Sequence, residues 1–595
     1  MCQPPDYTSA VAAPICSRLS CSGRVAAPSG VHARRRITGP RGVLILAALA
    51  IEGVALALWP ATYFLDSTEF PSRVGEMFQS RFGIVRPILS TLKTAVDWVV
   101  PGALWSWPNL VAFTFEAVLV AFFAYALAAW RLTAVSPDGN RPRGGRSPAN
   151  KSLLPWIVAP LLLFQITLVL IPATMSTDIF NYALYGEMPV LYDANPFVHT
   201  AAEFPQSPLF YLIPLYWHDA PSVYGPFWVA LSMGVASTFR SSPLAEELLA
   251  YRLIANGAHF CNTLLIWALA RRIHPGRESS AALAYGWNPL LLVDFAMNGH
   301  NDALMLSFVL GAFLLAAYGR MRASALMLGI SIACKFTSVL IAPVLMLWAV
   351  TWGVGTRLRI WPIERSRLIR IGLALLLWGA LTGLSAAVWY LPWIQGEDPL
   401  GPVKYWVTGP RLHNFWPEPA LITLTSWISG PLGADYEETW RWVFDGFKLL
   451  GKIGLALYIC FEAIRARTLD DVLAASARIT LAFLLLVNTW VLSWYYSWPL
   501  ALCAALGWRS RTVRVAAGFT LTALVLTYQN QYSETFVADW GGIMMIMPLL
   551  LAIAPGMATR LRALAFSTKS DPSPSMPGQG FASAEEMRGM DTSQR

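Results

Sequence analysis

Long apolar segments recur along almost the whole chain, and they limit the possible folds more than any other feature. A helix that crosses a bilayer needs about 20 apolar residues, and shorter ones are tolerated where neighbouring helices bury them. By this criterion we predict about 14 transmembrane helices, within a range of about 12–14. The chain is therefore predicted to be an all-α polytopic membrane protein. The segments lie near residues 43–65, 109–131, 153–174, 249–272, 281–297, 302–319, 323–338, 339–352, 371–393, 443–465, 472–492, 494–508, 512–529 and 540–557.

The low content of charged residues agrees with this prediction. Only 13% of the 595 residues are charged and 55% are hydrophobic, whereas soluble domains carry about 25% charged residues. The composition excludes an ordinary soluble enzyme and makes the lipid bilayer the first partner of this chain.

Basic residues lie between the apolar segments, where they orient the chain in the membrane. The net charge of +9 could suggest a nucleic-acid partner. However, the basic clusters follow the positive-inside bias if the N-terminus is cytoplasmic and Phe227–Phe239 lies on or dips into the outer face. We therefore expect a multi-pass plasma-membrane protein with no nucleic-acid partner. The clusters are Arg34–Arg36, Arg141–Lys151, Arg271–Arg272, Arg320–Arg322, Arg357–Arg370, Arg465–Arg467, Arg509–Arg514 and Arg560–Arg562.

The same topology divides the chain into a membrane domain and two tails. Residues 1–42 and 558–595 are expected to be disordered cytoplasmic tails, the second because it is rich in Ser, Pro, Gly and charge. The membrane domain spans 43–557, with a main extracytoplasmic loop at 175–248 and a second one at 394–442. None of the seven cysteines falls in a predicted outer loop, so no disulfide framework is expected.

Polar and ionisable residues gather at the predicted outer surface of the membrane, where such groups are costly unless they work or pair. Asp178 follows the third predicted span, and Lys335 lies 12 residues into its span, about 18 Å from the inner side. A carboxylate there can take a proton from an attacking hydroxyl, cations can hold a phosphate, and aromatic rings can stack on a sugar. The further residues at this level are His300, Asn301, Asp302, Arg411, His413, Trp217 and Tyr224.

Structural explanations compete with these roles. Asp178 could be a helix N-cap or a boundary charge, and the group His300, Asn301 and Asp302 could form a turn that caps the next helix. Lys335 could extend its ammonium group to the interface instead of binding a phosphate. Each signal is unspecific alone, and their common depth favours function.

Several motifs together resemble the C-type glycosyltransferases (GT-C). They are an aspartate after an early span (Asp178), "YALYG" (182–186), "ANPF" (194–197), "SVYGPFW" (222–228) and "NGHNDALM" (298–305), with looser matches at "NFWPEPALITL" (414–424) and "SWYYSWPL" (493–500). The chain is most similar to the polyprenol-phosphomannose-dependent alpha-mannosyltransferases.

This resemblance implies a GT-C helical bundle with an active site outside the cytoplasm. The donor would be a sugar on a polyprenyl phosphate and the acceptor a glycolipid or polysaccharide. Asp178 would act as the base or orient the acceptor, while Tyr182, Tyr185 and Asn195 would shape the loop over the sugar. The resemblance leaves the second acid open, with Asp193 and Asp302 as candidates.

The expected reaction is an inverting transfer of a sugar, most simply mannose. Lys335 with Arg411 or His413 would bind the phosphate, and no metal or other cofactor is expected, although a divalent metal is compatible with the family. Two other classes stay open: a transporter or flippase of a lipid-linked sugar, which would need polar residues along a path through the membrane, and a non-catalytic assembly protein.

Overall fold

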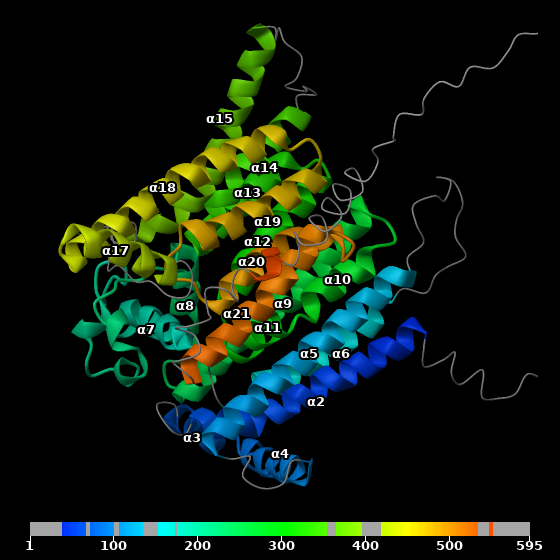
Figure 1. Cartoon of the computed structure of the whole chain (residues 1–595), viewed down its shortest axis with the longest axis vertical. Coiled ribbons are helices and arrows are strands. Elements are labelled where there is room, and N and C mark those ends of the chain that lie inside the picture. Colours follow the sequence, from blue (N-terminus) through cyan, green and yellow to red (C-terminus); the bar gives the residue numbers. More distant parts are fainter. Residues whose placement is uncertain are drawn as a thin grey trace, which may run out of the picture.

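The described part of the molecule is entirely helical (Figure 1). The computed structural model describes residues 39–66, 72–99, 106–135, 153–172, 175–353, 365–394, 418–532 and 547–550. Every regular element in these ranges is a helix, which confirms the all-α prediction. Most of the two predicted tails, the 540–557 segment and Arg411 and His413 lie outside the described residues.

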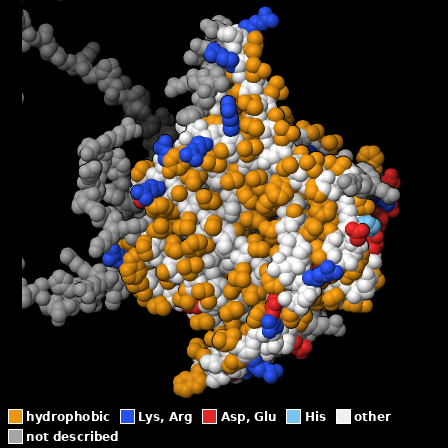
Figure 2. Space-filling model, turned by 180° about the vertical axis from the view of Figure 1, so that it is seen from behind, with side chains coloured by type: hydrophobic (Ala, Val, Ile, Leu, Met, Phe, Trp, Pro, Cys, Tyr) orange, Lys and Arg blue, Asp and Glu red, His pale blue; other side chains and the backbone are white. Residues whose placement is uncertain are grey.

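Length and apolar composition identify fewer spans than the sequence predicts. Four helical segments qualify within the described ranges, Pro40–Thr62, Asn109–Thr133, Leu244–Ile273 and Leu368–Trp393, or five if a bent pair is one span. The predicted count of about 14 is therefore not confirmed. Figure 2 shows a broad face covered with hydrophobic side chains and basic side chains toward its edges, as expected of a membrane protein.

The N-terminal part is built on two long helices that lie side by side, α2 (Pro40–Asp66) and α5 (Trp107–Val135). The shorter α6 (Pro155–Val169) packs against α2. Two short helices, α3 (Ser72–Arg81) and α4 (Val85–Val99), lie together at one end of this group (Figure 1).

The 175–248 segment, predicted as the main outer loop and called the outer loop below, folds into helices that pack tightly on one another. Helix α7 (Asp178–Leu191) lies against α8 (Pro226–Phe239), with the 3₁₀ turns η2 (Ala201–Glu203), η3 (Phe210–Leu212) and η4 (Leu215–Trp217) between them in sequence. A Cβ on Gly186 would lie 2.4 Å from the Ser232 carbonyl oxygen, so only glycine permits this approach. The segment Phe227–Phe239, predicted to lie on the outer face, is thus helical. Helix α8, which contains it, has 14 residues, fewer than the roughly 20 that a span needs.

The central helices include a span that the sequence predicted as continuous and the structure breaks. Helix α9 (Leu244–Ile273) packs against α10 (Glu278–Gly286) and α12 (Asp302–Ala317). The predicted span 281–297 is instead α10, α11 (Pro289–Leu291) and the π-helix η5 (Leu292–Met297), and the chain turns by 118° before α12. Pro289 causes the break, because it disfavours helix at the residue before it, and Asn288 then caps α11.

A second break lies at Lys335. Helix α13 (Met321–Cys334) ends there, Lys335 is extended with φ −153° and ψ 123°, and η6 (Phe336–Ile341) and α14 (Ala342–Gly353) follow. The Gly225 N–H donates to the Cys334 carbonyl at 3.1 Å. A Cβ on Gly225 would lie 2.0 Å from the Ala333 carbonyl oxygen. Glycine at position 225 therefore lets the outer loop hold this break.

The C-terminal part supplies the remaining walls of the bundle. Helix α15 (Arg365–Ala387) continues as η7 (Val388–Trp393), and α17 (Glu418–Leu432) precedes the long α18 (Tyr436–Arg465). Helix α19 (Leu469–Leu486) is followed by η8 (Ser493–Tyr496), α20 (Ser497–Cys503), η9 (Ala504–Leu506) and α21 (Arg511–Tyr532).

Candidate active site

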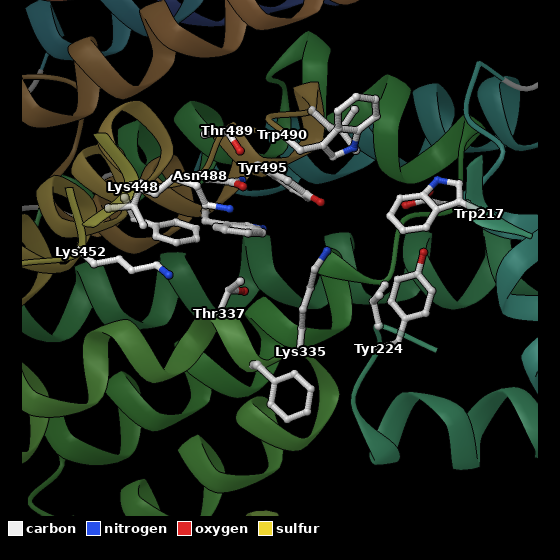
Figure 3. Close-up of a pocket in the computed structure, with 17 residues that line it drawn as sticks. Trp217, Tyr224, Lys335, Thr337, Lys448, Lys452, Asn488, Thr489, Trp490 and Tyr495 are labelled. Atoms are coloured by element: carbon white, nitrogen blue, oxygen red, sulfur yellow. The ribbon is translucent and has the colours of Figure 1, made fainter. Parts of the chain in front are cut away.

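A pocket of about 180 Å³ lies where the outer loop, the break at Lys335 and the C-terminal helices meet (Figure 3). Its charged lining residues, within the described ranges, are Asp178, Lys335, Lys448 and Lys452. The remaining lining is aromatic, apolar or neutral polar: Trp217, Val223, Tyr224, Phe336, Thr337, Phe483, Val487, Asn488, Thr489, Trp490, Leu492, Tyr495 and Trp498.

Asp178 is the first residue of α7 and faces the pocket. Thr177 occupies the N-cap position without a side-chain cap bond, so the structure does not use Asp178 as the cap. The first turn of a helix stabilises a carboxylate. Asp178 Oδ2 lies 3.6 Å from His300 Nδ1, and the two side chains are 13% and 0% exposed. The acid is therefore held between a helix N-terminus and a buried imidazole.

His300 is held by stacking and by its backbone. Its ring stacks on Trp494, with centroids 3.6 Å apart. Neither ring nitrogen has a hydrogen-bond partner among the described residues. Gly299, with φ +75°, turns the chain between the π-helix and His300, a conformation that favours glycine. The His300 N–H donates to the Asp294 carbonyl at 3.1 Å, so the π-helix fixes the position of this residue.

Asp294 and Asn298 connect the two sides of the turn. The Asn298 amide donates to Asp294 at 3.0 Å, and Ser493 donates to the other Asp294 oxygen at 3.1 Å. Asn298 also accepts from the Met175 N–H at 2.9 Å. This network joins the "NGHNDALM" and "SWYYSWPL" segments to the start of the main outer loop.

Lys335 reaches the pocket but its charge is already paired. Its Nζ lies 2.8 and 2.9 Å from the two carboxylate oxygens of Asp302, which is fully buried. The Trp498 indole N–H donates to Asp302 at 2.6 Å, and Nζ lies 4.9 Å from the Tyr495 ring centroid. The Lys335 ammonium group is therefore held beside Asp302 and Trp498.

The cap suggested for the helix after His300 also does not form as expected. Asn301 occupies the N-cap position of α12 without a side-chain cap bond. Instead its Oδ1 accepts from the Tyr182 hydroxyl at 3.3 Å. The segment therefore connects α12 to α7.

Aromatic residues form the end of the pocket next to Asp178. Trp217 and Tyr224 line it, and Tyr182 packs edge-on against Tyr224, with centroids 4.8 Å apart. Burial first, and then the negative charge of Asp178, raise the pKa of the Tyr224 and Tyr182 hydroxyls well above the usual range. Both phenols therefore stay protonated and can donate hydrogen bonds.

Six residues expected to bind substrate do not line the pocket: Tyr182, Tyr185, Asn195, His300, Asn301 and Asp302. The Tyr185 hydroxyl donates to the Ala220 carbonyl at 3.0 Å. The Asn195 side chain donates to the Trp393 carbonyl at 3.3 Å and accepts from the Phe197 N–H. The first three of these residues support the loop that carries Trp217 and Tyr224.

Sequence reasoning missed much of the opposite wall. Lys448 and Lys452 lie one helical turn apart on α18, inside a segment predicted only as a span. Two lysines four residues apart in an apolar helix were the available signal. Trp494, Tyr495 and Trp498 lie in the "SWYYSWPL" motif, which contributed only to the family resemblance. The spacing of this motif did not predict which residues the three rings contact.

The described residues contain no cluster of metal-binding side chains. No three His, Cys, Asp or Glu side chains come together there in a way that could hold an ion. Asp302, with both oxygens on Lys335, is committed to that ion pair.

The pocket of this helical protein combines a carboxylate, lysines and stacked aromatic rings, which are groups that could bind a sugar phosphate. Comparison with known proteins shows which enzymes the chain resembles. Residues 87–351 match the family model described as "Alpha-(1→6)-mannopyranosyltransferase, N-terminal domain". The resemblance inferred from the motifs is thereby confirmed, and this chain is similar to alpha-(1→6)-mannopyranosyltransferases.

Curated relatives agree with the family model. Alpha-(1→6)-mannopyranosyltransferase A of Mycobacterium tuberculosis is 24% identical over 379 residues, which are 62% of this chain and 67% of that protein. A probable alpha-(1→6)-mannopyranosyltransferase of Mycolicibacterium smegmatis is 30% identical over 34% of this chain and 33% of its own length. The B enzyme of Corynebacterium glutamicum is 26% identical over 33% of this chain and 32% of its own length. The chain thus spans about a third of the last two relatives.

The family match covers one side of the pocket. Asp178, His300 and Lys335 lie inside residues 87–351, whereas Lys448 and Lys452 lie beyond them. The region that matches the family model therefore includes Asp178, whereas the structure alone places Lys448 and Lys452 in the pocket.

Proposed function

We propose that this protein transfers mannose from a polyprenyl-phosphate donor to a glycan or glycolipid acceptor on the extracytoplasmic face of the plasma membrane. The observation that carries the proposal is the position of Asp178 in one pocket with lysines and stacked aromatic rings. The carboxylate serves an acceptor hydroxyl, the cations serve a phosphate, and the rings serve the sugar. The names of the homologues supply mannose as the sugar.

The reaction follows from these roles. Asp178 accepts the proton of the acceptor hydroxyl while the oxygen of that hydroxyl attacks the anomeric carbon of the donor sugar. The bond between that carbon and the phosphate oxygen breaks, and its electron pair leaves with the phosphate. Attack from the face opposite the phosphate inverts the anomeric centre. His300, in contact with Asp178, keeps the carboxylate oriented toward the acceptor.

The test is mannose transfer from synthetic polyprenyl-phosphate mannose by the purified full-length protein in lipid nanodiscs. Asp178→Asn keeps the shape of the side chain and removes the base, so the rate should fall by about 10²–10⁴-fold. Asp219→Asn is the matched control, because Asp219 is an exposed aspartate of the same 175–248 segment and lies outside the pocket. Equal activity of wild type and Asp178→Asn would remove Asp178 from the mechanism.

The principal alternative is a transporter or flippase of a lipid-linked sugar. Such a protein would move the donor between leaflets and form no new glycosidic bond. A wild-type protein that releases no polyprenyl phosphate with any acceptor, but moves labelled donor across a vesicle membrane, would favour this alternative.

A further inference from the structure

We infer that Lys448 and Lys452 of α18 form the phosphate-binding part of the pocket and stabilise the departing polyprenyl phosphate. This inference rests on the proposed function and deepens it, because it assigns the phosphate to a helix outside the matched family region. Lys335, which is paired with Asp302, then has a structural role in the site.

The charges around the pocket point to this assignment. Lys335 has its ammonium group on both oxygens of a buried carboxylate. This pairing holds the Lys335 ammonium group beside Asp302. Lys448 and Lys452 line the same pocket, and no carboxylate except Asp178 shares the lining within the described residues. The lysine end of the pocket therefore favours an anion.

The arrangement of the lining residues gives the ligand a direction. In Figure 3, Lys448 and Lys452 lie on one side of the pocket and Trp217 and Tyr224 on the other, with Lys335 between them. The aromatic side adjoins Asp178 and suits a sugar. The phosphate then extends toward α18. Lysines four residues apart lie about 6 Å apart along the helix and on one face, so both can reach the oxygens of one phosphate.

The position of the lysines on α18 favours a lipid phosphate over a soluble anion. Lys448 is half-buried and Lys452 is exposed at the edge of the helix. The neighbouring Leu449, Ile453 and Leu457 are 59%, 50% and 67% exposed, an apolar face suited to lipid. A ligand with its chain in the bilayer can therefore bring its phosphate to these lysines. Thr337, Asn488 and Thr489 line the pocket as neutral polar partners.

Two lysines also match the change in charge during the reaction. The donor is a phosphodiester with one negative charge, and the released polyprenyl phosphate is a monoester that approaches two. The second charge develops as the bond to the anomeric carbon breaks. Cations placed where charge develops stabilise the transition state more than the bound donor. The lysines should therefore bind the product phosphate more tightly than the donor.

The experiment compares binding of polyprenyl phosphate, polyprenyl-phosphate mannose and the neutral polyprenol of equal length to the full-length protein in nanodiscs. Lys448→Gln/Lys452→Gln should weaken polyprenyl phosphate binding by about tenfold or more. It should weaken donor binding less and leave polyprenol unchanged. Lys448→Arg/Lys452→Arg should restore the preference for the phosphate. Arg441→Gln is the control, because Arg441 is a 59% exposed cation on α18 outside the pocket.

The outcomes separate this inference from the proposed function. If wild type transfers mannose and Lys448→Gln/Lys452→Gln keeps the full preference for the phosphate, the lysine assignment is wrong and the proposed function stands. If wild type transfers no mannose yet loses phosphate binding in the glutamine variant, the lysine site stands and the proposed function is wrong. If millimolar inorganic phosphate displaces the bound ligand as well as polyprenyl phosphate does, the inference that the site binds a lipid phosphate is wrong.

Discussion

Asp178 Oδ2 faces His300 Nδ1 at 3.6 Å, although the two residues lie on different elements and 122 positions apart. His300 is fully buried and stacks on Trp494. The imidazole thus has one ring face covered and one nitrogen directed at the carboxylate. This geometry suits a positioning residue that controls the orientation of Asp178.

We expect His300→Gln to lower kcat for mannose transfer by about tenfold or more, less than removal of the base itself. KM for the donor should change little, because His300 contacts Asp178 and does not line the pocket. Steady-state kinetics of mannose transfer measure both constants. His199→Gln is the matched control, because His199 is a 42% exposed histidine of the same outer loop outside the pocket. A kcat equal to that of wild type would exclude the positioning role.

Asp302→Asn should strongly destabilise the protein. It leaves the Lys335 ammonium buried without its carboxylate, and breaking a buried ion pair in this way costs about 3–5 kcal/mol. Asp302→Asn/Lys335→Met should recover part of the loss, which thermal unfolding in detergent can measure. Asp97→Asn breaks a half-exposed ion pair with Lys93 and should cost about 1 kcal/mol or less. Similar losses for Asp302→Asn and Asp97→Asn would contradict the structural role of the buried pair.

Gly225→Ala should displace the break that carries Lys335. The added Cβ would lie 2.0 Å from the Ala333 carbonyl oxygen, and backbone on both sides must move. We expect a lower unfolding temperature and a weaker affinity for the donor. Gly234→Ala in α8 is the control, since a Cβ there meets nothing within 4 Å. Alanine should stabilise that helix by up to about 1 kcal/mol. Equal unfolding temperatures for the two variants would refute the close approach at Gly225.

Glu187 should make stability depend on pH. Burial raises the pKa of this carboxyl in α7 to about 7, and a hydrogen bond with Ser207 offsets part of the rise. The folded state therefore holds this proton more tightly than the unfolded chain, in which the pKa is near 4.5. The stabilising contribution is complete below pH 4.5, falls as the pH rises toward about 7 and is lost above that value.

Glu187→Gln removes this ionisation and should flatten the decline in unfolding temperature between pH 5 and pH 8. Glu437→Gln, at a carboxylate that is 84% exposed, provides the control. If the variant with glutamine at position 187 keeps the full decline, another group causes it.

Local sequence patterns predicted the helical class and many helix positions. The predicted segments 43–65, 109–131 and 249–272 correspond to α2, α5 and α9, because each is a long apolar run with weak interruptions. The 281–297 prediction was wrong as one helix, since Pro289 and the π-helix break it. Hydropathy averages over a window and does not register such breaks, which are where Asp294 and His300 are positioned.

The candidate site was predicted in part. Asp178, Trp217, Tyr224 and Lys335 line the pocket, and these were selected by residue type and predicted depth. Tyr182, Tyr185 and Asn195 share that depth but point elsewhere. Depth along a helix follows from residue number, whereas the direction of a side chain from a loop depends on packing.

The sequence by itself determined that this chain is a helical membrane protein, because apolar content and the length of apolar runs are local properties that the bilayer reads directly. It also predicted Asp178 as the acid, through motifs in the first half of the chain. The tertiary structure alone decided that Asp302 neutralises Lys335 and that Lys448, Lys452 and Trp494 complete the site. Asp302 and Lys335 are 33 positions apart and on different helices, and Trp494 lies 194 positions from His300. The pairing of such segments depends on how breaks in several helices pack together, which no single stretch encodes.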